Sequence, residues 1–125
     1  MSAAKRFEDL EVWKVAFDLV RQIYSISGIS PFAGDFGLKD QIRRASASAM
    51  TNIAEGFSRK STPDFIRFLD IARSSTAEVQ SLLYIARSQE YVSQEQFDAS
   101  YETCRVLRFK IGALIRYLRN YRPTT

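Results

Sequence analysis

Apolar residues recur at spacings of three and four along most of this chain, which is the period of an amphipathic α-helix. The pattern breaks at glycine, proline or clusters of small polar residues, as expected between helices. No segment of useful length shows the alternation of apolar and polar residues that is typical of a β-strand. We therefore expect four helices, over residues 8–27, 35–57, 63–89 and 94–121.

Two of these helices carry recognisable start signals. Ser93 and Gln96 have the spacing of a capping box, in which each side chain accepts a hydrogen bond from the other residue's backbone N–H. Before the third helix, Thr62 is the expected cap and Pro63 the expected first helical residue. These signals fix the two N-terminal boundaries more firmly than the apolar pattern does.

The predicted helices are rods of similar length joined by short connections. Such helices pack as antiparallel neighbours, so the sequence predicts an all-α fold: an antiparallel up-down-up-down four-helix bundle, a single domain over residues 1–125. The run from Ala45 to Ala49 alternates alanine and serine, and its small side chains predict a close approach between the second helix and its neighbours. The alternative is that this run merely tolerates a helix.

The apolar arcs of the first, third and fourth helices are wider than one bundle seam requires. Contiguous apolar patches on a surface mark interaction sites, and closed symmetric homo-oligomers are the commonest assemblies. We therefore expect self-association. The apolar residues outside the central stripes are Trp13, Ile66, Ile71, Tyr84, Ile85, Val106 and Tyr117.

Composition limits the chemistry that this chain can perform. Its 125 residues include no histidine and one cysteine, which removes the commonest general base, most zinc and di-iron sites and any internal disulfide. Cys104 falls on the apolar face of the fourth helix, where a core position is more plausible than a nucleophile. We expect no enzyme activity, no catalytic residue, no metal and no cofactor.

Three polar residues remain as candidates for chemistry: Asn52, Glu55 and Glu78. Glu78 shares its helix face with apolar residues, where a carboxylate is costly unless it has a partner. We interpret the three as a structural polar network, with Glu78 in a salt bridge between helices or subunits. The alternative for an isolated buried glutamate is an acid with a raised pKa.

The chain shows no signal for a membrane. Its first residues lack the apolar run of a signal peptide, and no stretch approaches 18 uncharged apolar residues. With the low cysteine content, this predicts a soluble cytoplasmic protein that does not contact a membrane.

The formal net charge is +4, and the excess of basic residues lies in the second and fourth helices. Residues 105–122 contain no acid, and four of their arginines share an arc of about 80° around Gly112. Such a ridge suits a phosphate backbone, and Phe109 and Tyr117 flank it as faces on which bases can stack. The arginines of this arc are Arg105, Arg108, Arg116 and Arg119.

Both basic helices also have a simpler explanation. The arc is compatible with an ordinary solvated helix face, and Glu102 is placed to pair with Arg105. On the second helix, Arg43 and Arg44 are further candidates for nucleic-acid contact. Asp40 lies three and four residues before them, however, so local ion pairing is the stronger explanation there.

Four segments carry a resemblance to a known family: residues 7–14 (FEDLEVWK), 36–45 (FGLKDQIRRA), 52–57 (NIAEGF) and 65–73 (FIRFLDIAR). They resemble the bacterial four-helix-bundle proteins encoded in intervening sequences of 23S rRNA genes. A similar bundle is the accessory variability determinant of diversity-generating retroelements. The resemblance covers about residues 7–120, nearly the whole chain.

The resemblance implies a ring-shaped homopentamer of basic bundles and, in the retroelement branch, binding to nucleic acid and to a reverse transcriptase. It attaches no catalytic role to the matching positions. Ala47 and Ala49 depart from the family pattern, so we expect the packing there to differ in detail. The positions that match the motif are Arg43, Arg44, Asn52, Glu55 and Glu78.

Three classes of function remain at this point. The first is a non-enzymatic homo-oligomer that binds nucleic acid, either rRNA or other structured RNA or DNA, through its basic surfaces. The second is a protein-interaction scaffold, for example an accessory subunit of a nucleic-acid enzyme. An enzyme is the third and has the least support.

Overall fold

The computed structural model describes residues 4–121, and within them every regular element is helical. Four long helices are present, which confirms the predicted all-α bundle. Two single-turn 3-10 helices precede α1 and α2. The elements are η1 (Phe7–Asp9), α1 (Glu11–Ser27), η2 (Phe32–Gly34), α2 (Phe36–Phe57), α3 (Thr62–Ser88) and α4 (Gln94–Asn120).

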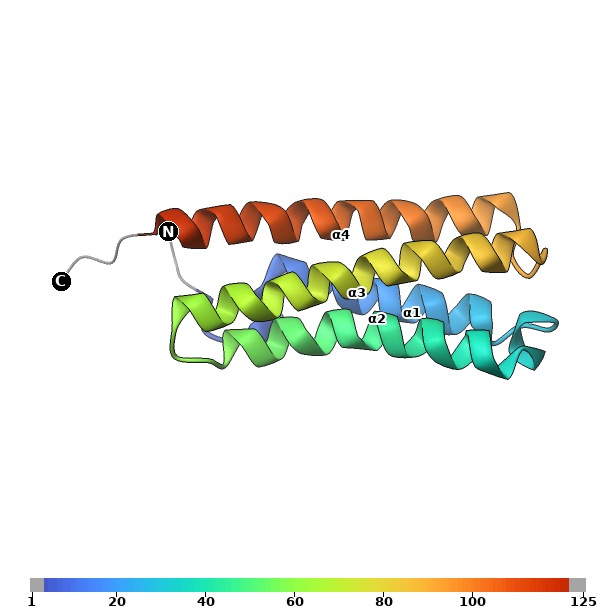
Figure 1. Ribbon diagram of the computed structural model, residues 1–125, viewed down its shortest axis with the longest axis horizontal. Coiled ribbons are helices and arrows are strands. Elements are labelled where there is room, and N and C mark those ends of the chain that lie inside the picture. The colour runs from blue at the N-terminus through green and yellow to red at the C-terminus, as the bar shows by residue number, and fades with distance from the viewer. Residues whose placement is uncertain (1–3, 122–125) are drawn as a thin grey trace.

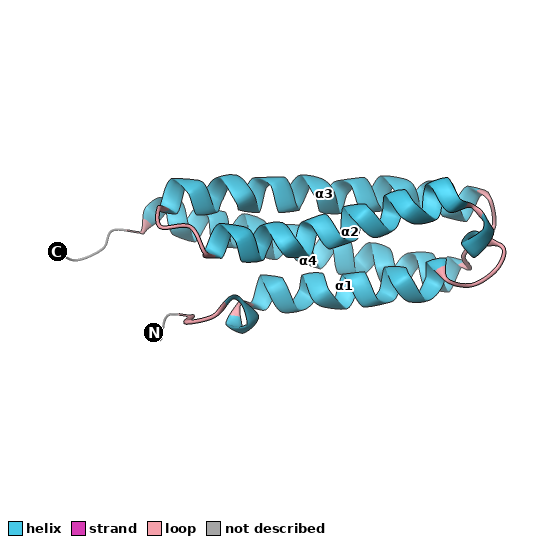
Figure 2. Ribbon diagram, turned by 90° about the horizontal axis from the view of Figure 1, so that it is seen from below, coloured by secondary structure: helices cyan, strands magenta, loops and turns pink. Residues whose placement is uncertain are grey.

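The four long helices run alternately up and down, so that the start of α1 and the end of α4 lie at the same end of the bundle (Figure 1). Each helix contacts the two helices next to it in a ring, α1 with α2, α2 with α3, α3 with α4 and α4 with α1. Consequently α2 and α4 occupy diagonally opposite corners. The view in Figure 2 shows the short connections at both ends.

The caps agree with the sequence at α4 and differ by one residue at α3. The Ser93 N–H donates to Gln96 Oε1 over 2.8 Å and the Gln96 N–H donates to Ser93 Oγ over 3.1 Å, which confirms the capping box. At α3 the cap is Ser61, whose hydroxyl accepts from the Asp64 N–H, and the expectation of Thr62 was wrong. Pro63 is tolerated as second residue because none of the first four N–H groups of a helix has a partner within it.

The first helix begins three residues later than predicted. Residues 8–10 were expected in it, but the chain forms η1 and then an extended residue, Leu10, before α1 starts at Glu11. The short turn brings the ring of Phe7 to 5.3 Å from that of Trp13, so aromatic packing replaces a further helical turn. The other helix ends lie within one residue of their predicted positions.

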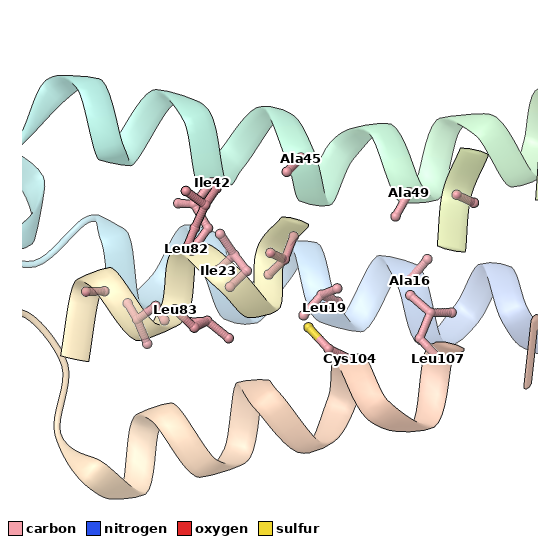
Figure 3. Packing of buried hydrophobic residues seen from close by; sticks show 14 of the residues in the cluster. Ala16, Leu19, Ile23, Ile42, Ala45, Ala49, Leu82, Leu83, Cys104 and Leu107 are labelled. Atoms are coloured by element: carbon pink, nitrogen blue, oxygen red, sulfur yellow. The ribbon is translucent and has the colours of Figure 1, made fainter. Parts of the chain in front are cut away.

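The predicted apolar stripes meet in one core along the bundle axis (Figure 3). All four helices contribute fully buried residues, among them Leu19, Ile42, Leu83 and Leu107. Cys104 lies in the same core, as predicted, and its burial raises the pKa of the thiol to about 12. The thiol is therefore protonated at neutral pH and is not a nucleophile.

The closest helix approach that involves the small residues is between α2 and α3. Ala45 and Ala49 are buried, and the hydroxyl oxygens of Ser48 and Ser75 lie 2.9 Å apart across the two helices. Further along α2, a Cβ added to Gly56 would lie only 2.6 Å from the Cβ of Phe68. The small side chains of α2 therefore allow the close approach to a neighbouring helix that the sequence predicted.

Among the helices described between residues 4 and 121, none combines the length and hydropathy needed to cross a bilayer.

Replacing Gly56 with alanine is expected to lower the free energy of unfolding by about 1–2 kcal/mol, because the clash with Phe68 outweighs the gain in helix propensity. The matched control is Gly112→Ala, whose added Cβ meets its nearest neighbour at 3.6 Å. It is expected to be neutral or stabilising by up to about 1 kcal/mol. Urea unfolding followed by circular dichroism measures both, and shifts of the same sign and size would contradict the close approach at Gly56.

Candidate nucleic-acid interface

The helices α3 and α4 pack side by side in antiparallel directions (Figure 1). Two rows of mostly polar residues face each other across this contact. Each row follows spacings of four or seven residues, so each keeps to one side of its helix. We name this strip the α3–α4 seam. It consists of Arg73, Gln80 and Tyr84 on α3 and Tyr101, Arg108, Gly112 and Arg116 on α4.

One end of the seam is aromatic and its middle is polar. The rings of Tyr84 and Tyr101 lie 5.7 Å apart, centroid to centroid. One turn further along α3, the buried Gln80 accepts a hydrogen bond through its Oε1 from Arg108 Nη1 over 3.1 Å. This bond fixes the Arg108 guanidinium against α3 while the residue itself stays exposed.

The other end of the seam brings two cations together over a glycine. A Cβ placed on Gly112 would lie 3.6 Å from Arg73 Nη1 and 3.7 Å from Arg116 Nη1. Two guanidinium groups therefore converge on one point of the α4 backbone, which is buried there and carries no side chain. Arginine forks in this arrangement suit a phosphate oxygen, which accepts two parallel hydrogen bonds from each fork.

Acidic side chains neutralise only part of the predicted arginine arc. Glu102 accepts two hydrogen bonds from Arg105, at 2.8 and 2.6 Å, which hold the pKa of its carboxyl below the usual range. On α3, Asp70 pairs with Arg73 over 2.8 Å. Within residues 4–121 no carboxylate forms an ion pair with Arg108 or Arg116.

The last arginine of the arc and the two predicted stacking residues lie outside the α3–α4 seam. Arg119 occupies the last turn of α4. The predicted stacking residues Phe109 and Tyr117 are both exposed. Phe109 lines a shallow apolar depression of ≈ 340 Å³ beside the start of α1, and the Tyr117 ring lies 6.0 Å from that of Tyr121. These two rings contact residues outside the seam.

Arg43 and Arg44 lie on α2, diagonally across the bundle, so the structure does not bring them to the arginines of α4. Arg43 Nε donates to Ser27 Oγ over 2.8 Å, and its Nη2 donates to the Tyr24 carbonyl over 3.2 Å. Its guanidinium also lies 4.2 Å from the centroid of the Tyr24 ring. Arg43 thus fastens α2 to the last turn of α1, whereas Arg44 pairs with Asp40 on its own helix.

The predicted polar network is divided between separate places. Asn52 Nδ2 donates to the Ser48 carbonyl over 2.8 Å and to Ser48 Oγ over 3.0 Å, which links it to the serine pair between α2 and α3. Glu55 instead pairs with Arg59 four residues later, over 2.9 Å. Asn52 therefore supports the helix contact, and Glu55 lies on the surface.

Glu78 is exposed, which corrects the expectation that it lies among buried apolar residues. The Gln41 Nε2 donates to its carboxylate over 3.2 Å, so it has a partner on α2 but no salt bridge within residues 4–121. The physical reason is that Ile71 and Ile85, which share its face, are themselves 38% and 47% exposed. Among the helices described between residues 4 and 121, none buries these two isoleucines.

The sequence matches one known protein family. The sequence model of the 23S rRNA-intervening sequence protein family matches residues 8–113, most of the chain. The chain belongs to this family. Three of the four motif segments, residues 36–45, 52–57 and 65–73, fall wholly within the matched range, so the resemblance seen in the sequence is confirmed for this family.

A solved structure agrees with the fold of this family member. The crystal structure of a protein with unknown function from the S23 ribosomal protein family of Bacteroides thetaiotaomicron VPI-5482 superposes with a TM-score of 0.77. It is 24% identical, and the match covers 84% of this chain and 95% of that one. At this identity the likeness shows the fold. A search among curated proteins finds no match.

Sequence reasoning missed the α3 half of the seam. Residues 62–92 carry more acids than bases, so Arg73 did not stand out, and Gln80 is an unremarkable polar residue on a helix. The antiparallel register between the third and fourth predicted helices could have identified these residues. Two helices that fold back about the connection at residues 89–93 place Arg73 opposite Gly112, at nearly equal distances from the turn. Among residues 4–121, no group of metal-binding side chains is present in this seam or elsewhere.

Replacing Arg43 with alanine is expected to lower the free energy of unfolding by about 1–2 kcal/mol, because Ser27 and the Tyr24 carbonyl both lose their donor. The control Arg44→Ala removes an equal charge from an exposed surface pair and is expected to change stability by less than about 0.5 kcal/mol. Thermal and urea unfolding measure the difference. Equal effects would contradict the structural role of Arg43.

Proposed function

We propose that this family member is a non-enzymatic homo-oligomer that binds nucleic acid, with the α3–α4 seam as its principal phosphate contact. The observation that carries the proposal is the convergence of Arg73 and Arg116 on Gly112. Like charges are placed together at a cost unless an anion or a paired acid compensates them. Asp70 compensates Arg73 alone, so a phosphate has a favourable place between the two forks.

The chemistry of such binding is positional and electrostatic. Guanidinium groups that bind phosphates release condensed counterions, so affinity falls as salt rises. Phosphate contacts orient a protein on its ligand but carry no sequence information, and the chain has no motif that reads base edges. Selectivity would therefore come from the shape of the RNA or DNA. The family name, which refers to an intervening sequence of 23S rRNA, supports RNA as the ligand class to test first.

Self-association is the second part of the proposal. Ile71 and Ile85 lie on the outward face of α3 and are 38% and 47% exposed. Ile71 lines a shallow depression of ≈ 560 Å³ together with Ile66 and Glu78, and Ile85 follows Glu78 by seven residues on the same side of the helix. A second copy would cover this apolar face and give Glu78 the inter-subunit setting that the sequence suggested. The family resemblance favours a homopentamer, whose charge would be five times the +4 of one chain.

A protein-interaction scaffold is the alternative, and one observation favours it. Phe109 is 67% exposed and lies beside an apolar depression of ≈ 340 Å³ between the start of α1 and α4. Exposed aromatic side chains beside a concave apolar surface are typical of protein interfaces. An accessory subunit of a nucleic-acid enzyme, as in the retroelement proteins that the sequence resembles, would use such a site together with the basic seam.

Replacing Arg73, Arg108 and Arg116 together with glutamine is expected to reduce affinity for structured RNA and for duplex DNA by similar factors. The slope of log affinity against log salt should also fall by about 2 to 3, since each lost phosphate contact removes nearly one released counterion. Fluorescence anisotropy at several salt concentrations measures both quantities.

The matched control changes three exposed basic residues outside the seam, Lys5, Lys14 and Arg21, to glutamine. It lowers the net charge by the same amount and is expected to change affinity much less than the seam variant. Equal losses from both variants would show that net charge alone drives binding. Wild-type affinity that does not depend on salt, or the absence of binding, would reject the proposed function.

Replacing Ile71 and Ile85 together with aspartate is expected to convert the assembly to monomers, because charged side chains on the outward face of α3 oppose its burial. Analytical ultracentrifugation of the wild type and the variant measures the solution mass. The control Ile29→Asp alters an isoleucine that is 55% exposed in the connection between α1 and α2 and should leave the mass unchanged. A monomeric wild type would reject the proposed assembly.

A further inference from the structure

The aromatic end of the α3–α4 seam has a feature that phosphate binding does not use. Tyr84 is 58% exposed although it belongs to a packed cluster. The centroid of its ring lies 5.0 Å from that of Phe97 and 5.7 Å from that of Tyr101, at interplanar angles of 61° and 76°. Neither neighbour stacks flat against Tyr84, and together they hold the ring in place on the surface.

The rings beneath Tyr84 pack closely on each other. Phe97 is buried and stacks on Tyr101 with centroids 5.4 Å apart and an interplanar angle of 22°. The neighbouring Tyr101 side chain raises the pKa of Tyr84. A tyrosine side chain is uncharged at neutral pH even at its ordinary pKa of about 10. An uncharged ring that is already ordered loses little conformational entropy when a flat ligand stacks on it.

The ring lies in line with the arginines of the seam. Gln80, which holds Arg108, is one helical turn from Tyr84 on α3, and Arg73 lies about 16 Å from Tyr84 along the helix axis. One strand of a DNA duplex advances about 3.4 Å along the axis per nucleotide, so an unwound strand needs about five nucleotides or fewer to span this distance. A single strand is therefore long enough to contact both ends of the seam at once.

We propose that Tyr84 is a stacking platform for an unpaired base, and that the strand continues from it along Arg108 to the pair Arg73 and Arg116. The inference rests on the proposed function and adds the class of ligand, a single-stranded segment of RNA or DNA. Both have phosphates for the arginines, and both have bases with a π face that stacks on an aromatic side chain. A base within a duplex is already stacked on its neighbours and has no face free for Tyr84.

The test compares strands that differ only in their bases. Fluorescence anisotropy measures the affinity of the full chain for a labelled oligouridine of about ten nucleotides and for an abasic strand with the same number of phosphates. Wild-type protein is expected to bind the oligouridine about ten-fold more tightly. An oligothymidine of equal length distinguishes a general single-strand site, which binds both, from one that requires the ribose hydroxyl.

Three variants separate stacking from folding. Tyr84→Leu is expected to lower the affinity for oligouridine to that for the abasic strand and to leave the abasic affinity and the salt slope unchanged. Tyr84→Phe retains the ring without the hydroxyl and should keep the wild-type preference. Phe36→Leu removes a ring that is 74% exposed at the start of α2, on the opposite corner of the bundle from α4, and should have no effect on the preference.

The outcomes distinguish this inference from the function on which it rests. Wild-type protein that binds both strands equally, or a Tyr84→Leu variant that keeps the preference for bases, overturns the stacking role and leaves phosphate binding intact. A Tyr84→Leu variant that weakens both strands equally also overturns it. Absence of binding to either strand overturns both proposals.

Discussion

The burial of four apolar stripes in one core is the constraint on which the other features of this bundle depend. Leu19, Ile42, Leu83 and Leu107 come from four different helices and are all fully buried. Because each stripe must face the axis, the rotation of every helix about its own axis is fixed. The short connections fix the antiparallel direction. The rotation and the direction of the helices together determine which residues face each other across each helix contact.

The contacts of α3 with α2 and with α4 differ in the kinds of residue that face each other. Against α2 the approach is close, with Gly56 below Phe68 and a hydrogen-bonded pair of serines, so this contact contributes to stability. Against α4 the facing residues include arginine, glutamine and tyrosine around Gly112. Here two guanidinium groups lie close to the backbone of α4, and the contact acquires a chemistry that the core does not have.

The sequence predicted the elements well because local signals determine them. The capping box at Ser93 and the apolar periods gave boundaries within a residue for most helix ends. The late start of α1 at Glu11 escaped prediction because it depends on Phe7 packing against Trp13 rather than on helical periodicity.

The candidate site was predictable only in part, since contacts between helices are not local. The arc on α4 was visible in the chain, whereas its partners Arg73 and Gln80 depend on the register between two helices. Arg43 has a similar charge and a similar helical setting to the arc residues, yet it binds Tyr24 and Ser27 of α1. Glu78 looked buried from its own helix because nothing in a single sequence shows that Ile71 and Ile85 have no cover.

The proposed assembly face and the proposed binding seam lie on the same helix. The single helix α3 carries Ile71 and Ile85 on its outward face and Arg73 with Tyr84 on the face toward α4. A rigid helix keeps these two faces at a constant angle and distance. Subunits joined through the outward face would therefore present copies of the seam at a regular spacing, and a ligand held by one copy would meet the next at high effective concentration. Avidity, rather than the strength of any single seam, would then determine which ligands are retained.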